Sequence, residues 1–329
     1  MRRAHPTLAL LGAVLLGPAT LGLSGCGLKP ASAFLPAIEP GTIKPIKNLE
    51  GARLRVTSKE FTEQIVLGKL AVLALTAAGA KVQDNTNVQG SVTARLSITG
   101  GDNDLMWEYT GTGWITYLGR TEPIVDPQRQ FDAVAALDLK KHHIAWLPPP
   151  APLNNTYTIA VSPATQRKYG LTDLSQLSSV PVGQRTICTE PEFFSRNDGL
   201  RGMLAAYGLK YGSGVPAKNV MQMSAGVVYN SVKNGKCTFG QVTATDGRIQ
   251  ALDLKVLKDD KHFFPNYNPA ITVRESVLKA HPELTPIFAQ ISPKLTTEVM
   301  RTLNSKVDVD GDDPVFVARD WMRAQGFIK

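Results

Sequence analysis

Segments with strand-like and helix-like patterns alternate along the chain from about residue 54 onward. Extended patterns cover residues 54–56, 81–88 and 104–109, and apolar residues at helical spacing cover residues 63–78 and 91–98. Gly79 marks the end of the first of these helices. This alternation favours α/β layers around a mostly parallel sheet, in which ligands bind beyond the carboxyl ends of the strands.

A proline-rich break at residues 148–152 separates this alternation from a second one. Strand candidates follow at 157–161, 185–188, 220–223 and 238–242, with helical stretches at 199–206 and 225–234. Residues 254–273 return to the first unit, and residues 287–303 and 315–325 have helical apolar spacing. We therefore expect two α/β lobes joined by two crossover strands near Asn155 and His262. Lobe 1 comprises residues 51–155 and 264–329, and lobe 2 comprises residues 156–263. A cleft between hinged lobes is a frequent ligand site.

The first 26 residues have the parts of an export signal. Arg2 and Arg3 precede an apolar stretch at residues 8–23, and residues 23–26 read Leu-Ser-Gly-Cys. These four residues resemble the lipobox of bacterial lipoproteins, which implies lipidation of Cys26 and an extracytoplasmic chain anchored by lipid to the cell membrane. A single transmembrane anchor is the alternative, although glycines and a proline interrupt the apolar stretch. We expect residues 27–50 to form a flexible tether, because they are rich in proline and glycine.

Two cysteines remain if Cys26 carries lipid, namely Cys188 and Cys237. A disulfide between them is plausible in an exported protein, and two separate buried thiols are the alternative.

Charge and motifs exclude several function classes. The net charge of +8 is spread thinly, without basic runs interleaved with aromatic residues, so nucleic-acid binding is not expected. The histidines lack a Glu or Cys at metal-ligand spacing, and no nucleophile elbow, phosphate loop or dinucleotide fingerprint is present. The sequence therefore predicts no metal, no cofactor and no enzyme activity.

Five blocks carry a resemblance to one family over nearly all of the mature chain. They are TSKEFTEQ (57–64), EYTGTG (108–113), NNTY (154–157), TDGRI (245–249) and DDKHFFP (259–265). In this order they resemble the glycine betaine/choline/carnitine substrate-binding proteins of osmoprotectant ABC transporters. The resemblance implies the type II periplasmic-binding-protein fold and delivery of a quaternary-ammonium solute to an ABC permease and its ATPase. We expect the chain to act as a monomer.

The resemblance also implies a set of site residues. A trimethylammonium group has no N–H to donate and carries a diffuse charge, so aromatic faces are its favourable partners, whereas a betaine carboxylate favours cations and hydroxyls. Matching positions give cage residues Tyr109, Tyr157 and Tyr267, carboxylate-binding residues Lys59, Thr112 and Arg196, and a backbone carbonyl at Asn155.

One position departs from the family pattern. The family usually has an aromatic residue, often Tyr, where this chain has Thr243, two residues before the TDG sequence. A missing cage wall would weaken trimethylammonium binding by about 0.5–2 kcal/mol, or would admit a polyol, an aromatic compound or a glycoside instead. Trp107 lies two residues before Tyr109 and could serve as a replacement wall. A sensor lipoprotein without a transport role is a further alternative.

Overall fold

The structure is a computed structural model that describes Met1, residues 35–122 and residues 124–329. The predicted signal peptide from residue 2, the lipidation residue Cys26 and the first part of the predicted tether lie outside the described residues. In the described part of the chain, no helix is both long enough and apolar enough to cross a bilayer.

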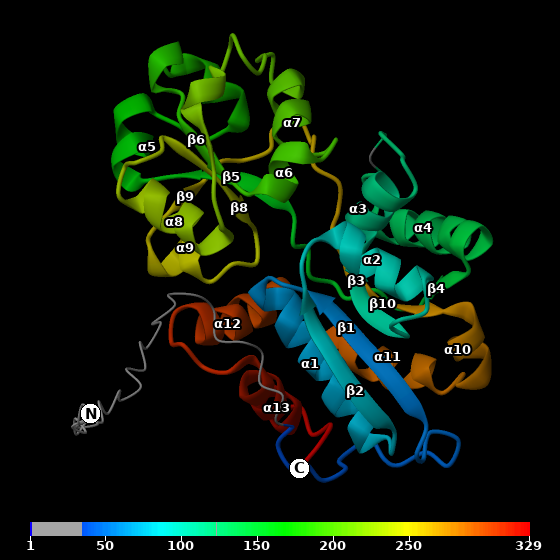
Figure 1. Ribbon diagram of the computed structural model, residues 1–329. Coiled ribbons are helices and arrows are strands. Elements are labelled where there is room, and N and C mark those ends of the chain that lie inside the picture. The colour runs from blue at the N-terminus through cyan, green and yellow to red at the C-terminus, as the bar shows by residue number, and fades with distance from the viewer. Residues whose placement is uncertain (2–34, 123) are drawn as a thin grey trace. The chain divides into compact units, whose positions relative to one another are not determined.

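Two five-stranded sheets form the frame of the molecule (Figure 1). The first has the order β2-β1-β3-β10-β4, with β1 (Arg53–Lys59), β2 (Lys81–Val88), β3 (Leu105–Tyr109), β4 (Ile144–Trp146) and β10 (Pro269–Arg274). The second has the order β7-β6-β8-β5-β9, with β5 (Tyr157–Val161), β6 (Ile187–Thr189), β7 (Val220–Gln222), β8 (Phe239–Thr243) and β9 (Lys255–Val256). We call each sheet with its helices lobe 1 and lobe 2, respectively.

Each sheet contains one strand that the chain enters directly after it leaves the other lobe. In lobe 1 this strand is β10, which runs antiparallel to both β3 and β4. In lobe 2 it is β5, which runs antiparallel to both β8 and β9. The chain therefore crosses between the lobes twice, and both lobes share one strand order.

Helices cover both sheets. Lobe 1 has α1 (Thr62–Ala77), α2 (Ser91–Thr99), α3 (Thr110–Thr112), α4 (Pro127–His142), α10 (Glu275–Ala280), α11 (Leu284–Ile291), α12 (Thr297–Asp308), α13 (Pro314–Ala324) and a π-helical turn, Gly113–Tyr117. Lobe 2 has α5 (Pro163–Tyr169), α6 (Pro191–Ser195), α7 (Leu200–Ala206), α8 (Ala225–Lys233) and α9 (Arg248–Ala251). Short 3-10 turns lie at Leu174–Ser179, Val182–Gln184, Ala217–Asn219 and Ser292–Lys294.

Helix α1 is the centre of the lobe 1 core. It is buried on nearly all sides, because it lies between the sheet and helices α12 and α13 (Figure 1). Its leucines join Trp107, Phe288 and Met322 in one continuous apolar cluster. A helix apolar all round is expected only where it is fully enclosed, as α1 is.

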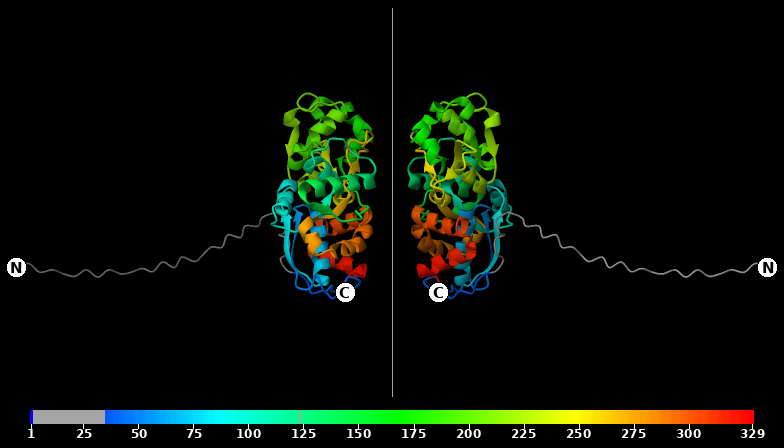
Figure 2. Two further views of the ribbon diagram at one scale, coloured as in Figure 1. Left: turned by 90° about the vertical axis from the view of Figure 1, so that its right-hand side faces the viewer. Right: turned by 90° about the vertical axis from the view of Figure 1, so that its left-hand side faces the viewer.

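Residues 35–50 correct the prediction of a flexible tether over 27–50. The backbone N–H groups of Gly41 and Ile43 donate to the carbonyl of Phe327 at 3.1 and 3.2 Å. The side chains of Ile43 and Leu49 are buried in the lobe 1 core. This segment contains apolar residues among its prolines and glycines, and their burial fixes it to lobe 1. Figure 2 shows the blue start of the folded body beside the red C-terminal helix.

The C-terminal helical prediction over 287–303 is wrong in one respect. The structure breaks it into α11 and α12, separated by a turn that contains Pro293. Proline has no N–H and clashes with the preceding turn of a helix, which explains the break. Thr296 then caps α12 by accepting a hydrogen bond from the N–H of Val299 at 3.2 Å.

The two crossovers are irregular segments and not strands, contrary to expectation. Residues 147–156 and 257–268 make the two passages, and prolines in both remove the donors that a ladder needs. The segments are joined near their C-terminal ends, where the N–H of Asn155 donates to the carbonyl of Tyr267 at 3.2 Å. The N–H of Tyr267 donates to Asn154 Oδ1 at 2.8 Å. The hinge is thus a pair of hydrogen-bonded loops.

Candidate binding site

The strand ends of both lobes carry the predicted site residues. Lys59 ends β1 and Tyr109 ends β3, where Tyr109 pairs with Pro269 at the start of β10. In lobe 2, Tyr157 begins β5 and pairs directly with Thr243 at the end of β8. In each sheet, the topology therefore brings residues that are far apart in the sequence to the same end of neighbouring strands, as the alternation of strands and helices predicts.

Four aromatic rings meet where the crossovers join lobe 2. The ring centroid of Tyr157 lies 4.9 Å from that of Phe193, 5.4 Å from that of Tyr267 and 6.4 Å from that of Phe264. The ring of Tyr267 also lies against Gly111, where a Cβ atom would come within 2.6 Å of two ring carbons. Gly111 must therefore lack a side chain, and the turn after Tyr109 reaches the Tyr267 ring.

Arg196 lies over two of these rings. Its guanidinium carbon is 5.5 Å from the ring centroid of Tyr157 and 6.0 Å from that of Tyr267. It donates from Nε to Asp198 Oδ1 at 2.8 Å, from Nη2 to Asp198 Oδ2 at 2.6 Å and from Nη1 to Glu192 Oε1 at 3.1 Å. The hydroxyl of Tyr267 donates to Asp198. Burial raises the pKa of Tyr157 and Tyr267, so both phenols keep their protons.

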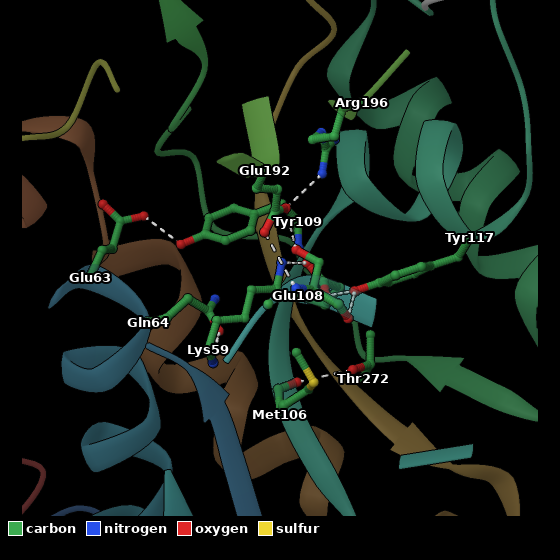
Figure 3. A network of polar contacts seen from close by, with 12 residues as sticks. Lys59, Glu63, Gln64, Met106, Glu108, Tyr109, Tyr117, Glu192, Arg196 and Thr272 are labelled. Atoms are coloured by element: carbon green, nitrogen blue, oxygen red, sulfur yellow. Dashed lines mark hydrogen bonds and ion pairs between the residues drawn. The ribbon is translucent and has the colours of Figure 1, made fainter. Parts of the chain in front are cut away.

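Tyr109 forms an aromatic wall on lobe 1. Its ring stacks with Phe61 at 6.1 Å, and Lys59 Nζ lies 5.1 Å from its centroid. Lys59 Nζ is 2.6 Å from Glu108 Oε1, and both side chains are almost fully buried. Figure 3 shows Glu108 at the centre of this network, where it also accepts hydrogen bonds from the Tyr109 N–H and the Tyr117 hydroxyl.

Two carboxylates bridge the lobes. Glu63 of α1 accepts hydrogen bonds from Tyr109 at 2.8 Å, from Asn304 at 3.1 Å and from the hydroxyl of Thr245 in lobe 2. Burial raises the pKa of Glu63, although these hydrogen bonds act in the opposite direction. Across the same seam, the hydroxyl of Ser91 on lobe 1 donates to Glu192 of lobe 2 at 2.6 Å. The lobes are therefore in direct contact beside the aromatic rings.

The remaining predicted residues lie close to these walls. Thr112 is buried in α3, just after Tyr109, and Asn155 is buried in the first crossover. Thr243 is half-buried, and its N–H donates to the hydroxyl of Tyr229 at 3.1 Å. Trp107 does not belong to the site. It is fully buried in lobe 1 with its ring edge against Phe288 at 5.9 Å, so its proposed role as a replacement wall is wrong.

Sequence reasoning missed Glu108, Glu192 and the phenylalanines beside these rings. A contact of Arg196 with Asp198, two residues later, is the alternative that the sequence offers to a ligand role for Arg196, and the structure contains that contact. Glu108 precedes Tyr109 and Glu192 lies four residues before Arg196, but the family pattern directs attention to ligand-binding aromatic and cationic groups. Phe193 and Phe264 lie within short runs of adjacent phenylalanines, whose spacing does not say which one faces the site.

Cys188 and Cys237 form a disulfide with their Cα atoms 5.8 Å apart. It lies beneath α8 of lobe 2, in the apolar cluster that also contains Val228 and Val242. The bond joins Cys188 of β6 to Cys237, which lies two positions before β8.

The family model for the substrate binding domain of ABC-type glycine betaine transport systems matches residues 52–324. The chain belongs to this family. A glycine-betaine-binding protein of Pseudomonas aeruginosa is 35% identical over 278 residues, which cover 82% of this chain and 87% of that protein. An ergothioneine transport permease/ergothioneine binding protein of Helicobacter pylori is 30% identical over 86% of this chain and 49% of its own length. A crystal structure titled glycine betaine/carnitine/choline ABC transporter superposes with a TM-score of 0.67 at 27% identity, and covers 84% of this chain and 99% of that one.

Membership of this glycine betaine transport family establishes the broad class of the protein. The chain is the extracytoplasmic substrate-binding component of an ABC transport system, and it is not an enzyme. Its two sheets have the α/β arrangement of periplasmic substrate-binding proteins, so the predicted fold class is confirmed.

Proposed function

We propose that this protein binds a quaternary-ammonium solute between its two lobes and presents it to an ABC permease. The observation that supports the proposal best is the arrangement of Tyr157 and Tyr267. Their centroids are 5.4 Å apart at the crossovers, and a guanidinium already lies over both rings. Rings that accept one delocalised, weakly hydrated cation are suited to a trimethylammonium group, which has the same properties.

Each wall has a distinct task in this proposal. Tyr109, supported by Phe61, offers a ring from lobe 1, and Tyr157 offers one from lobe 2. Tyr267 belongs to the hinge, so its ring is available to a ligand as the lobes approach one another. Closure removes water from the ammonium group and thereby strengthens its attraction to the rings. Glu63 and Glu192 hold the closed lobes together through the contacts across the seam.

The site of action follows from the N-terminal segment. We infer that lipid on Cys26 anchors a monomer to the outer face of the cell membrane, where a permease and its ATPase receive the solute. The Leu-Ser-Gly-Cys sequence at residues 23–26 supports this part of the proposal.

Replacement of Tyr157 tests the aromatic role. We expect Tyr157→Leu to weaken binding of choline, glycine betaine or carnitine by about 2- to 30-fold, because one cation–π contact contributes about 0.5–2 kcal/mol. Isothermal titration calorimetry measures the change, and thermal unfolding of both proteins checks that the fold is intact. Tyr157→Phe is the matched control, since it retains the ring and should bind almost as the wild type does. Equal affinities of the Leu variant and the wild type would remove Tyr157 from the site.

A second candidate ligand class depends on Thr243. This residue faces the same side of the sheet as Tyr157 and leaves the cage with a smaller side chain there. A polyol, an aromatic compound or a glycoside could use that space. A thermal-shift screen separates the classes, because a ligand that binds only the native state raises the melting temperature. Stabilisation by one of these compounds, with none from the quaternary amines, would favour the second class.

A further inference from the structure

We infer that the site prefers a solute with a net positive charge and no carboxylate, such as choline, over a zwitterion such as glycine betaine. The inference rests on the proposed function, since it concerns which quaternary-ammonium solutes enter the same site. It concerns the far end of the ligand, which the aromatic rings do not discriminate.

Lys59 is not available to a ligand carboxylate. Its Nζ lies 2.6 Å from Glu108 Oε1, with side-chain exposures of 2% and 1%. Glu108 Oε1 also accepts a hydrogen bond from the N–H of Tyr109 at 2.7 Å, and its Oε2 accepts one from the Tyr117 hydroxyl. A ligand that drew Lys59 away would leave a buried carboxylate without its cation, which is strongly unfavourable.

Arg196 is engaged in the same way. Asp198 receives two of its N–H groups in a bidentate pair, and Glu192 receives a third. The side chain of Arg196 is 5% exposed and that of Asp198 is 3% exposed. A bidentate arginine–carboxylate pair is among the strongest polar contacts, so a ligand carboxylate would have to compete with two carboxylates of the protein.

The charges around the rings leave an excess of carboxylate. The two cations, Lys59 and Arg196, are in direct ion pairs with three carboxylates, those of Glu108, Glu192 and Asp198. Burial acts to raise the pKa of Glu192, but the charges of Lys59 and Arg196 outweigh it and lower that pKa, so Glu192 remains ionised. An incoming carboxylate meets this surplus as a like charge, whereas a net cation is attracted by it.

Choline and glycine betaine make a matched pair for the test. They share the trimethylammonium head, and choline ends in a hydroxyl where glycine betaine ends in a carboxylate. We expect calorimetry on the mature wild-type protein at pH 7.5 to give a Kd for choline at least ten-fold lower than that for glycine betaine. Equal affinities, or tighter binding of glycine betaine, would overturn the inference while leaving the proposed function intact. Failure of choline, glycine betaine and carnitine alike would overturn the proposed function and the inference with it.

A charge-removing variant tests the cause of the preference. Glu192→Gln keeps the shape of the side chain and its acceptor for Ser91, but removes one negative charge from beside Arg196. We expect the ratio of the two Kd values to move at least five-fold toward glycine betaine. Glu50→Gln is the control, because it removes the same charge from an exposed position before β1 and should leave the ratio unchanged. An unchanged ratio in a folded Glu192→Gln protein would contradict the role of the carboxylate surplus.

Discussion

Lobe 1 and lobe 2 have the same strand order but differently built interiors. In lobe 1, one large apolar cluster surrounds α1 and extends to α11, α12 and α13, while two small clusters on the other face of the sheet contain Met106 and Ala270. In lobe 2, side chains alternate along the strands, so that Ile159 and Ile187 enter one cluster while Ala160 and Cys188 enter a smaller one on the other face. Strand order thus determines where the site lies, and core size determines how each lobe is stabilised.

The disulfide belongs to the smaller of the two lobe 2 clusters. Helices α6, α7 and α9 in this lobe have only five, seven and four residues, respectively, and so offer little apolar surface. A covalent link between β6 and Cys237, two residues before β8, compensates for a limited core. Lobe 1, with its fully buried α1, has an apolar interior large enough to do without such a link among the residues described.

Removal of the disulfide should produce the largest effect and should separate the lobes. The two cysteines are 49 residues apart, so Cys188→Ala with Cys237→Ala should lower the free energy of unfolding by about 3–4 kcal/mol in the chain-entropy model. Urea unfolding measures this loss. Hydrogen exchange should accelerate in β6 and β8, while β1 and β3 of lobe 1 keep their protection.

The control for this prediction is reduction of the wild-type disulfide. A reducing agent should destabilise the wild type and leave the double variant unaffected, which identifies the bond and not the alanines as the cause. Faster exchange to the same degree in both lobes would mean that they unfold as one unit, and the proposed difference in their stabilisation would then be wrong.

The second prediction concerns pH. Burial raises the pKa of Glu190, at the end of β6, to about 7, although a hydrogen bond from Gln241 opposes the shift. Since the folded state binds this proton more tightly than the unfolded state, the contribution of Glu190 to stability is greatest below about pH 4.5 and is lost as the pH rises toward 7. The loss is as much as about 3 kcal/mol, because one pKa unit corresponds to about 1.4 kcal/mol.

Glu190→Gln removes this titration. The test therefore compares the pH dependence of the free energy of unfolding in the variant and in the wild type. The free energy of unfolding of the variant, minus that of the wild type, should increase between pH 4.5 and 7.5 when both are measured by urea unfolding. Burial also raises the pKa of Glu63 in lobe 1, so the difference between the two profiles, and not the slope of either one alone, reports on Glu190. Parallel profiles for the two proteins would show that Glu190 does not titrate differently on folding.

The sequence predicted the fold better than it predicted the polar contacts of the site. Strand and helix patterns in residues 54–109 identify β1, β2 and β3 with α1 and α2 between them, because local periodicity encodes those elements. The break at Pro293 has a local cause, which the apolar spacing of residues 287–303 does not report. The attachment of residues 35–50 depends on tertiary packing that no local pattern reports. The pairing of Lys59 with Glu108 also depends on tertiary structure. The two residues are 49 positions apart, and only the neighbouring arrangement of β1 and β3 brings them together.

The smallest predicted effect is on ligand affinity and concerns Thr243, the position where the family usually has an aromatic residue. Thr243 lies directly opposite Tyr157 in the antiparallel β5–β8 pair, so a side chain placed there faces the same side as the Tyr157 ring. Thr243→Tyr should therefore add a second ring from lobe 2 and tighten trimethylammonium binding by about 0.5–2 kcal/mol, or 2- to 30-fold.

Calorimetry with choline measures this gain, and Thr243→Val is the control because it changes the polarity of the side chain without adding a ring. Both variants keep the backbone N–H that donates to Tyr229, so the end of β8 should retain its support. Tighter binding by the Tyr variant and not by the Val variant would show that the added ring, and not the change in polarity, strengthens the contact of lobe 2 with the ligand. Weaker binding would mean that lobe 2 uses the space beside Tyr157 for another part of its solute, which would make Thr243 a specificity residue and not a missing wall.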